Sequence, residues 1–228
     1  MKRIKNISLI VFLFGMCFSY GQKKEKRFPR DRFIFDVNYN SWLNEPDGFE
    51  QMPWKSVGVG FNFYKDIPLG YSASSFAWGL SYTVDKVHSN VSFLTRANIH
   101  GSTNNYTLIA AAPKSSSYRE NKFVTHYIDL PIELRLRTRG EATFHTHFGF
   151  KGGVMVNNFS RSRENGVKVK KYNIPDVNRF RYGPTFRIGY SNINFYGFYN
   201  MTSLFANQGD AFTPFTIGIS YFTGRDIF

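Results

Sequence analysis

The sequence predicts an all-β protein, an eight-stranded antiparallel transmembrane β-barrel with short periplasmic turns and longer extracellular loops. Three observations predict this fold: an N-terminal export signal, eight segments in which apolar and polar residues alternate, and connectors that alternate between short and long. Composition agrees, since 18% of the residues are aromatic and the chain has 19 glycines, which suits strands and tight turns. No long run of helix-forming residues follows residue 22.

The N-terminus has the pattern of a secretory signal peptide over residues 1–21. A basic start with Lys2 and Lys5 precedes a short, mostly apolar stretch, and small residues then stand at Ser19 and Gly21. The stretch is too short and wrongly flanked for a transmembrane helix, and the alternative is an anchor that is retained. The only cysteine, Cys17, lies in this segment, so the mature chain has no disulfide. We expect residues 22–32 to be a periplasmic lead-in and residues 33–228 to form the barrel domain.

The alternating segments are the expected strands of the barrel. In the longest segment, Ile128, Leu130 and Ile132 face one side while Asp129 and Glu133 face the other. Most segments have about the nine to eleven residues that a tilted strand needs to cross a bilayer. The eight segments are 33–43, 54–65, 74–86, 122–138, 143–157, 178–191, 193–205 and 213–222.

The connectors between these segments sort by length. Short connectors at 66–72, 139–142 and 191–192 alternate with long polar stretches. Outer-membrane barrels have turns on the periplasmic side and loops outside, whereas a soluble sandwich has no reason for this sorting. The long stretches are 44–53, 87–121, 158–177 and 206–212.

Alternation alone leaves open which face of the sheet points outward. Charged residues in mid-strand suit either the wet surface of a lipocalin-like barrel or the packed interior of a membrane barrel. The export signal, the aromatic content and the sorted connectors favour the membrane, where only a closed sheet satisfies the backbone of strands. We therefore predict a filled lumen without a continuous pore, holding a polar network of Asp36, Asp129, Glu133, Arg135, Arg137, Arg181 and Arg187.

Aromatic residues near the segment ends predict girdles at the two bilayer interfaces. The expected members are Trp42, Trp54, Tyr64, Tyr82, Tyr190, Tyr221 and Phe222. Two prolines, Pro131 and Pro184, fall inside strands of a barrel that has no free edge. We expect a β-bulge at each proline, or strand limits different from those given above.

Four stretches resemble the PorT-like outer-membrane β-barrel family of Bacteroidota. They are YIDLPIELRL at residues 127–136, FRYGPTFRIGY at 180–190, YNMTSLF at 199–205 and PFTIGIS at 214–220. The resemblance covers most of the mature chain and implies an eight-stranded barrel in the outer membrane. Some members of this family belong to the type IX secretion and gliding apparatus, and the family supplies no catalytic motif.

Histidines offer two chemical alternatives. His145 and His147 lie on one strand face about 7 Å apart, at a spacing that suits a metal if His126 or Glu133 joined them. His126 with Glu133 or Asp129 and a loop serine, Ser89 or Ser92, would resemble the nucleophile and base of a lipid A-modifying enzyme. His126, however, has the opposite strand parity to both acids. We therefore expect structural polar residues, no metal, no cofactor and no enzymatic activity.

Charge and loop length indicate the partners. The formal net charge is +13, and residues 1–21 hold three basic and no acidic residues, which leaves +10. Because export argues against nucleic acid, outer-membrane lipid and lipopolysaccharide are the expected counter-charges. Residues 160–171 are expected to form a solvated hairpin, with a grip on phosphates or an acidic partner as the alternative. Another envelope protein is a candidate partner for the 87–121 and 158–177 loops.

The sequence thus predicts a non-enzymatic protein in the outer membrane of a Gram-negative bacterium of the Bacteroidota. Its extracellular loops are expected to serve contact, adhesion or assembly. The alternatives are an accessory role in type IX secretion and gliding, and lipid A modification.

Overall fold

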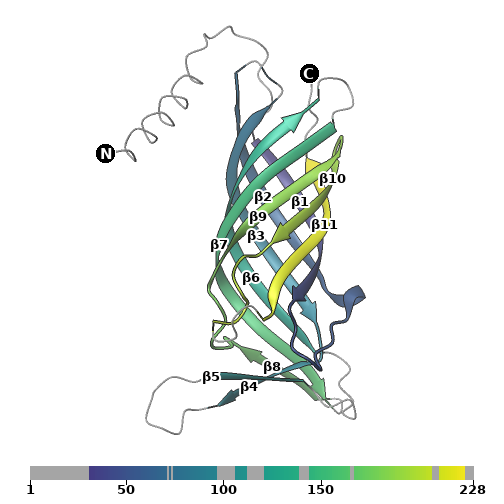
Figure 1. Cartoon of the computed structure of the whole chain (residues 1–228), viewed down its shortest axis with the longest axis vertical. Coiled ribbons are helices and arrows are strands. Elements are labelled where there is room, and N and C mark those ends of the chain that lie inside the picture. Colours follow the sequence, from purple (N-terminus) through teal and green to yellow (C-terminus); the bar gives the residue numbers. More distant parts are fainter. Residues whose placement is uncertain are drawn as a thin grey trace, which may run out of the picture.

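The computed structural model describes residues 31–70, 72, 74–96, 106–111, 121–138, 144–164, 167–206 and 211–223. Eight of the strands in these ranges form a closed antiparallel barrel (Figure 1), because β1 pairs with β11 and β6 pairs with β7. The predicted fold class is confirmed. The barrel strands are β1 (Asp31–Leu43), β2 (Val57–Pro68), β3 (Ser75–His88), β6 (Lys122–Arg137), β7 (Phe144–Glu164), β9 (Phe180–Tyr190), β10 (Ile193–Tyr199) and β11 (Thr213–Thr223).

Smaller elements gather at the loop end of the barrel (Figure 1). β4 (Val91–Arg96) and β5 (Tyr106–Ala111) form a separate hairpin, and the 3-10 turn η1 (Pro53–Lys55) precedes β2. β8 (Val167–Tyr172) pairs with the last six residues of β7, which run beyond the part that pairs with β9. The expected hairpin within residues 160–171 is therefore present, and the long loop at 87–121 contains strands of its own.

Several strand limits differ from those expected. β7 continues to Glu164 rather than 157, because its outer part keeps pairing with β6 and β8. β10 ends at Tyr199 rather than 205, since Leu204 and Phe205 turn inward to pack at the loop end. β1 begins at Asp31, so the last two residues of the expected lead-in belong to the barrel.

The expectation of a bulge at each proline is wrong. The register shift in the β6–β7 pairing lies between His126 and Tyr127, while Pro131 keeps its place opposite Lys151. On its other side, the β3–β6 ladder skips the pairs at Leu130 and Pro131 and resumes in the same register at Asp129. The β9–β10 ladder ends with the pair of Phe198 and Thr185, so it stops just short of Pro184, the neighbouring residue of β9. Each missing N–H is thus accommodated by a local gap or end in one ladder.

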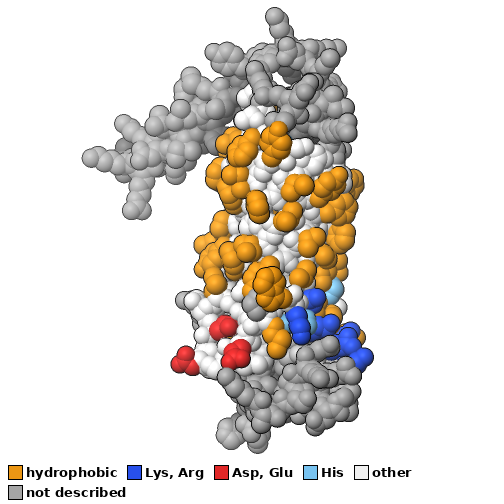
Figure 2. Space-filling view, turned by 90° about the vertical axis from the view of Figure 1, so that its right-hand side faces the viewer, with side chains coloured by type: hydrophobic (Ala, Val, Ile, Leu, Met, Phe, Trp, Pro, Cys, Tyr) orange, Lys and Arg blue, Asp and Glu red, His pale blue; other side chains and the backbone are white. Residues whose placement is uncertain are grey.

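The two faces of the sheet differ as the alternation predicts. β2 and β3 alternate strictly between exposed and buried residues over most of their length. Apart from Lys65, the exposed positions of these two strands are apolar, and side chains of this kind form a hydrophobic band on the face of the barrel shown in Figure 2. Nothing but lipid tails suits a continuous apolar band of this kind around a barrel. Within the described residues, no helix is long and apolar enough to cross a bilayer.

Short turns and long loops lie at opposite ends of the barrel (Figure 1). Between β9 and β10 the chain turns over Ser191 and Asn192, with Ser191 at a φ of 54°. Three expectations lie outside the described residues: the signal peptide at 1–21, most of the lead-in at 22–32, and the turn at 139–142.

Candidate functional site

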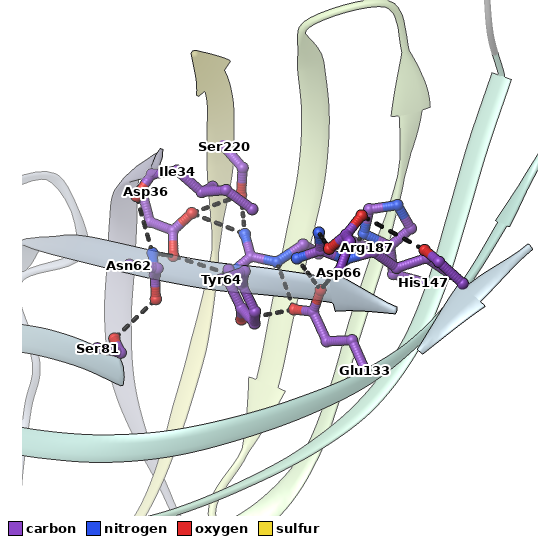
Figure 3. Close-up of polar contacts among 12 residues, drawn as sticks. Ile34, Asp36, Asn62, Tyr64, Asp66, Ser81, Glu133, His147, Arg187 and Ser220 are labelled. Atoms are coloured by element: carbon purple, nitrogen blue, oxygen red, sulfur yellow. Dashed lines mark hydrogen bonds and ion pairs between the residues drawn. The ribbon is translucent and has the colours of Figure 1, made fainter. Parts of the chain in front are cut away.

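Polar and charged side chains fill the lumen, and Glu133 lies at the centre of one group (Figure 3). The Tyr64 hydroxyl donates to Glu133 Oε1 over 2.6 Å, and Arg135 Nε donates to Oε2 over 2.9 Å. Arg135 also reaches Asp66 Oδ1 at 2.5 Å, and Arg137 reaches Asp66 Oδ2 at 2.6 Å. Strands β2 and β6 thereby bring two acids and two arginines together near the turn end.

Asp36 of β1 anchors a second group across the barrel (Figure 3). Arg187 of β9 binds both of its carboxylate oxygens, with Nη1 at 2.7 Å and Nη2 at 3.0 Å. Ser220 and Asn62 also donate to Asp36, over 2.6 and 2.8 Å. Because Arg187 Nε also approaches Glu133 Oε1 at 3.2 Å, the first two groups are continuous.

A third group lies closer to the loop end. Arg181 holds Asp129 with two hydrogen bonds of 2.7 and 2.6 Å and reaches Asp85 at 2.6 Å. Its guanidinium carbon also lies 3.7 Å from the centre of the Tyr127 ring. Lys151 Nζ is 3.9 Å from Asp129 and lies over the Phe198 ring at 4.0 Å. Charged residues from four strands, β3, β6, β7 and β9, thus meet in one interior layer.

The interior charges of the described lumen balance. Five carboxylates (Asp36, Asp66, Asp85, Asp129 and Glu133) face five cations (Arg135, Arg137, Lys151, Arg181 and Arg187). Buried charges are tolerated when they are paired and hydrogen-bonded. Nine of these ten groups hydrogen-bond to an opposite charge, and Lys151 lies 3.9 Å from Asp129. All seven residues of the expected polar network lie in it. Sequence reasoning missed Asp66, Asp85 and Lys151, although the inward parity of Asp66 with Asn62 in β2 is a usable signal.

Three residues expected at the bilayer interfaces point inward instead. Tyr64 and Phe222 are 1% exposed in the lumen, and Trp42 is 4% exposed at the loop end. The expectation followed residue type rather than position in the strand, for all three alternate with outward neighbours. The others, Trp54, Tyr82, Tyr190 and Tyr221, are exposed on the outer surface.

The structure brings His147 next to Glu133 but separates His126 from both acids. His147 Nδ1 lies 3.5 Å from Glu133 Oε2, and its ring stacks on Phe222. His145 and His147 are neighbours, with ring centres 5.9 Å apart. His126 lies on the outer face, bonded to the Tyr82 hydroxyl at 2.7 Å, whereas Asp129 and Glu133 point into the lumen. No group of three metal-ligating side chains occurs in the described part of the chain.

A hydrophobic cluster, here called the cap, covers the lumen at the loop end. Trp42 packs edge-on against Phe212, and Phe205 packs against both Phe123 and Phe212. A cavity of about 20 Å³, with room for about one water, separates the cap from Arg181. The buried members of the cap are Trp42, Val87, Val91, Phe123, Ile174, Val177, Leu204, Phe205 and Phe212.

Backbone hydrogen bonds tie the loops together above the cap. Loop 1 (residues 44–56) meets the base of the β4–β5 hairpin, where Asn90 N donates to Glu50 O and Met52 N donates to His88 O. On the other side, Val177 and Phe205 form a β-bridge between residues 173–179 and 200–206. We call these joined loops (residues 44–56, the base of the β4–β5 hairpin, 173–179 and 200–206) the loop platform. Within loop 1, partial burial raises the pKa of Glu45, and a hydrogen bond with Gln51 opposes this shift.

The filled lumen predicts that the protein forms no stable channel. In planar bilayers we expect no long-lived openings, because the paired charges and the cap leave no continuous water path. A general porin recorded under the same conditions controls for insertion of the protein. Reproducible openings of porin size would contradict the packing described above.

A closed antiparallel barrel with an apolar outer band and a polar, filled interior defines an integral outer-membrane protein. The family model for the outer membrane protein beta-barrel domain matches residues 27–208, and the chain belongs to this family. Its location is therefore the outer membrane. Among solved structures, the chain is similar to Ail, the attachment invasion locus protein of Yersinia pestis. The identity is 10% and the TM-score 0.33, over 85% of this chain and 98% of that one. Among curated proteins, no match was found.

Proposed function

We propose that this protein is a non-enzymatic outer-membrane barrel whose loop platform mediates contact, adhesion or assembly at the cell surface. The observation that carries the proposal is the cap, which closes the lumen and holds four loops in one surface. A barrel used for transport needs an open interior, whereas this one uses its interior for ion pairs. Long loops fixed on a rigid barrel are well suited to binding a partner.

The arrangement of the histidines supports a role without catalysis. His126 is the histidine of the lipid A-modifying alternative, and it lies on the outer face of the barrel. The barrel wall separates it from Asp129 and Glu133, which point into the lumen. Both acids are already engaged by arginines, which leaves neither as a base for a lipid substrate outside. A general base must lie within hydrogen-bond reach of the proton it removes.

We further propose that the chain is a PorT-like barrel from a member of the Bacteroidota. The stretches at residues 127–136 and 180–190 support this, and they form most of β6 and all of β9. On this proposal residues 1–21 are removed on export and residues 22–30 precede the barrel in the periplasm. Another envelope protein is the proposed partner of the 87–121 and 158–177 loops.

The contact role can be tested by removing one loop from an intact barrel. Residues 92–110 are replaced by a short Gly-Ser linker, and Val91 is kept because it packs in the cap. We expect cells producing this variant to lose most of their adhesion to surfaces and to each other, along with any partner that co-purifies in mild detergent. Heat-modifiable mobility on SDS gels checks that the barrel has folded.

The matched control replaces residues 70–74, in a turn at the opposite end, by the same type of linker. We expect this control to behave as the unmodified protein does. Equal adhesion and equal co-purification for the loop variant and the control would overturn the proposal.

A further inference from the structure

Part of the positive charge of the chain lies outside the lumen at the loop end. The interior carboxylates and cations balance, so the net charge of +10 that residues 22–228 carry lies outside the lumen. Figure 2 shows Lys and Arg side chains gathered at the loop end, directly beside the hydrophobic band, with histidine next to them. The acidic side chains visible in this view lie apart from that group.

Three cations of this region stand in a single row across neighbouring strands. Lys122 of β6 pairs with Arg161 of β7, and Arg161 pairs with Lys170 of β8. Directly paired residues share a face of the sheet, with Cβ atoms about 5 Å apart, and like charges in such positions repel. Lys168, two residues from Lys170, has the same parity. We call these four residues the basic row.

Aromatic side chains lie on the membrane side of the basic row. Phe159 and Tyr172 form the next cross-strand pair, and Lys170 Nζ lies 4.2 Å from the ring centre of Phe159 and 4.4 Å from that of Tyr172. His126, bonded to Tyr82, adjoins Phe159 with ring centres 6.0 Å apart. Rings of this kind mark the interface of a bilayer.

The apolar band begins directly beyond these rings. Val154 and Val156 of β7 are exposed to the lipid side, and Arg161 follows Phe159 by two residues, or about 7 Å along the strand. The basic row therefore lies at the level of the headgroups of the outer leaflet. Cations beside a membrane at this level attract anionic lipid headgroups.

We propose that Lys122, Arg161, Lys168 and Lys170 bind the phosphate groups of lipid A in the outer leaflet. Arginine and lysine make charge-assisted hydrogen bonds to phosphate oxygens, and arginine does so in a bidentate geometry. A phosphate shared by two cations of the row converts their mutual repulsion into attraction. The inference goes beyond the contact role, since it concerns the outer wall of the barrel rather than the loop platform.

Lipid binding by the full-length mature protein tests the proposal. Native mass spectrometry from detergent micelles counts bound lipid A and compares it with dephosphorylated lipid A and with inorganic phosphate. For Lys122→Gln/Arg161→Gln/Lys170→Gln we expect binding of lipid A to weaken at least tenfold, since each cation contributes about fivefold near an anionic surface. Dephosphorylated lipid A is expected to bind the unmodified protein as weakly as lipid A binds this variant.

The matched control removes three exposed cations outside the row: Lys55→Gln/Lys65→Gln/Arg179→Gln. Its net charge equals that of the row variant, and we expect its lipid A binding to stay close to that of the unmodified protein. Because Lys170 is exposed, the single variant Lys170→Gln should fold normally, and it is expected to weaken binding about fivefold.

Three results would overturn the proposal. One is equal weakening in the row variant and the control, which would indicate general charge attraction. Another is binding of inorganic phosphate with no preference for lipid A. The third is row-dependent binding of an acidic peptide such as polyglutamate with lipid A binding unchanged, which would assign the row to a protein partner.

Discussion

Asp36→Ala is expected to lower the free energy of unfolding by about 3–5 kcal/mol, because removing one partner of a buried ion pair leaves the other uncompensated. Arg187 makes two hydrogen bonds to Asp36 and is 2% exposed, so its charge cannot escape to water. Ser220 and Asn62 lose their acceptor as well. Urea titration in lipid vesicles, followed by tryptophan fluorescence, measures the change.

Two further variants make this prediction specific. Asp36→Ala/Arg187→Met removes both charges and is expected to be more stable than Asp36→Ala alone, since no lone buried cation remains. Asp47→Ala, on an exposed loop residue, should change stability little. If Asp36→Ala proved no more destabilising than Asp47→Ala, the ion-paired lumen would be refuted.

Ile132→Arg is expected to destabilise the barrel by about 2–4 kcal/mol, the cost of an arginine on the lipid face at the bilayer midplane. Ile132 is the central member of five outward apolar residues in β6, which run from Ile128 to Leu136, and it is 46% exposed. Folding into vesicles monitored by urea titration again gives the value.

Position along the strand provides the control for this second prediction. Leu136→Arg lies at the turn end of the same series, where the cost falls to about 0–1 kcal/mol. The side-chain change is identical and only the depth differs. Equal, small effects at Ile132 and Leu136 would mean that this face of the barrel does not contact lipid tails.

The strands could be predicted from the sequence because each carries its own alternation of apolar and polar residues. In β6, the inward positions of Asp129, Glu133 and Arg135 follow from that period alone. The same rule would have placed Tyr64, Trp42 and Phe222 inside, had position in the strand been weighed above residue type. Interfacial preference is a weaker physical constraint than the pleat of a strand.

The partners within the lumen could not be predicted in this way. Asp36 and Arg187 meet across the barrel, and that meeting depends on the shear of the closed sheet, which alternation does not encode. The cap was missed for a related reason. Leu204 and Phe205 were expected at the end of the 193–205 strand and Phe212 in a long connector, but all three are buried by contact with other loops rather than by a local pattern.

The pairing of β1 with β11 joins residues at the two ends of the chain, such as Phe33 with Thr223. This seam stays open until the last strand has been synthesised, so the chain must travel with unpaired strand edges that need protection from aggregation. Ser220 reaches Asp36 across 184 residues of sequence. The barrel therefore closes in the same step that completes the hydrogen bonds to Asp36. A chain truncated before β11 would keep an open strand edge in the bilayer and a buried carboxylate that lacks one of its hydrogen-bond donors.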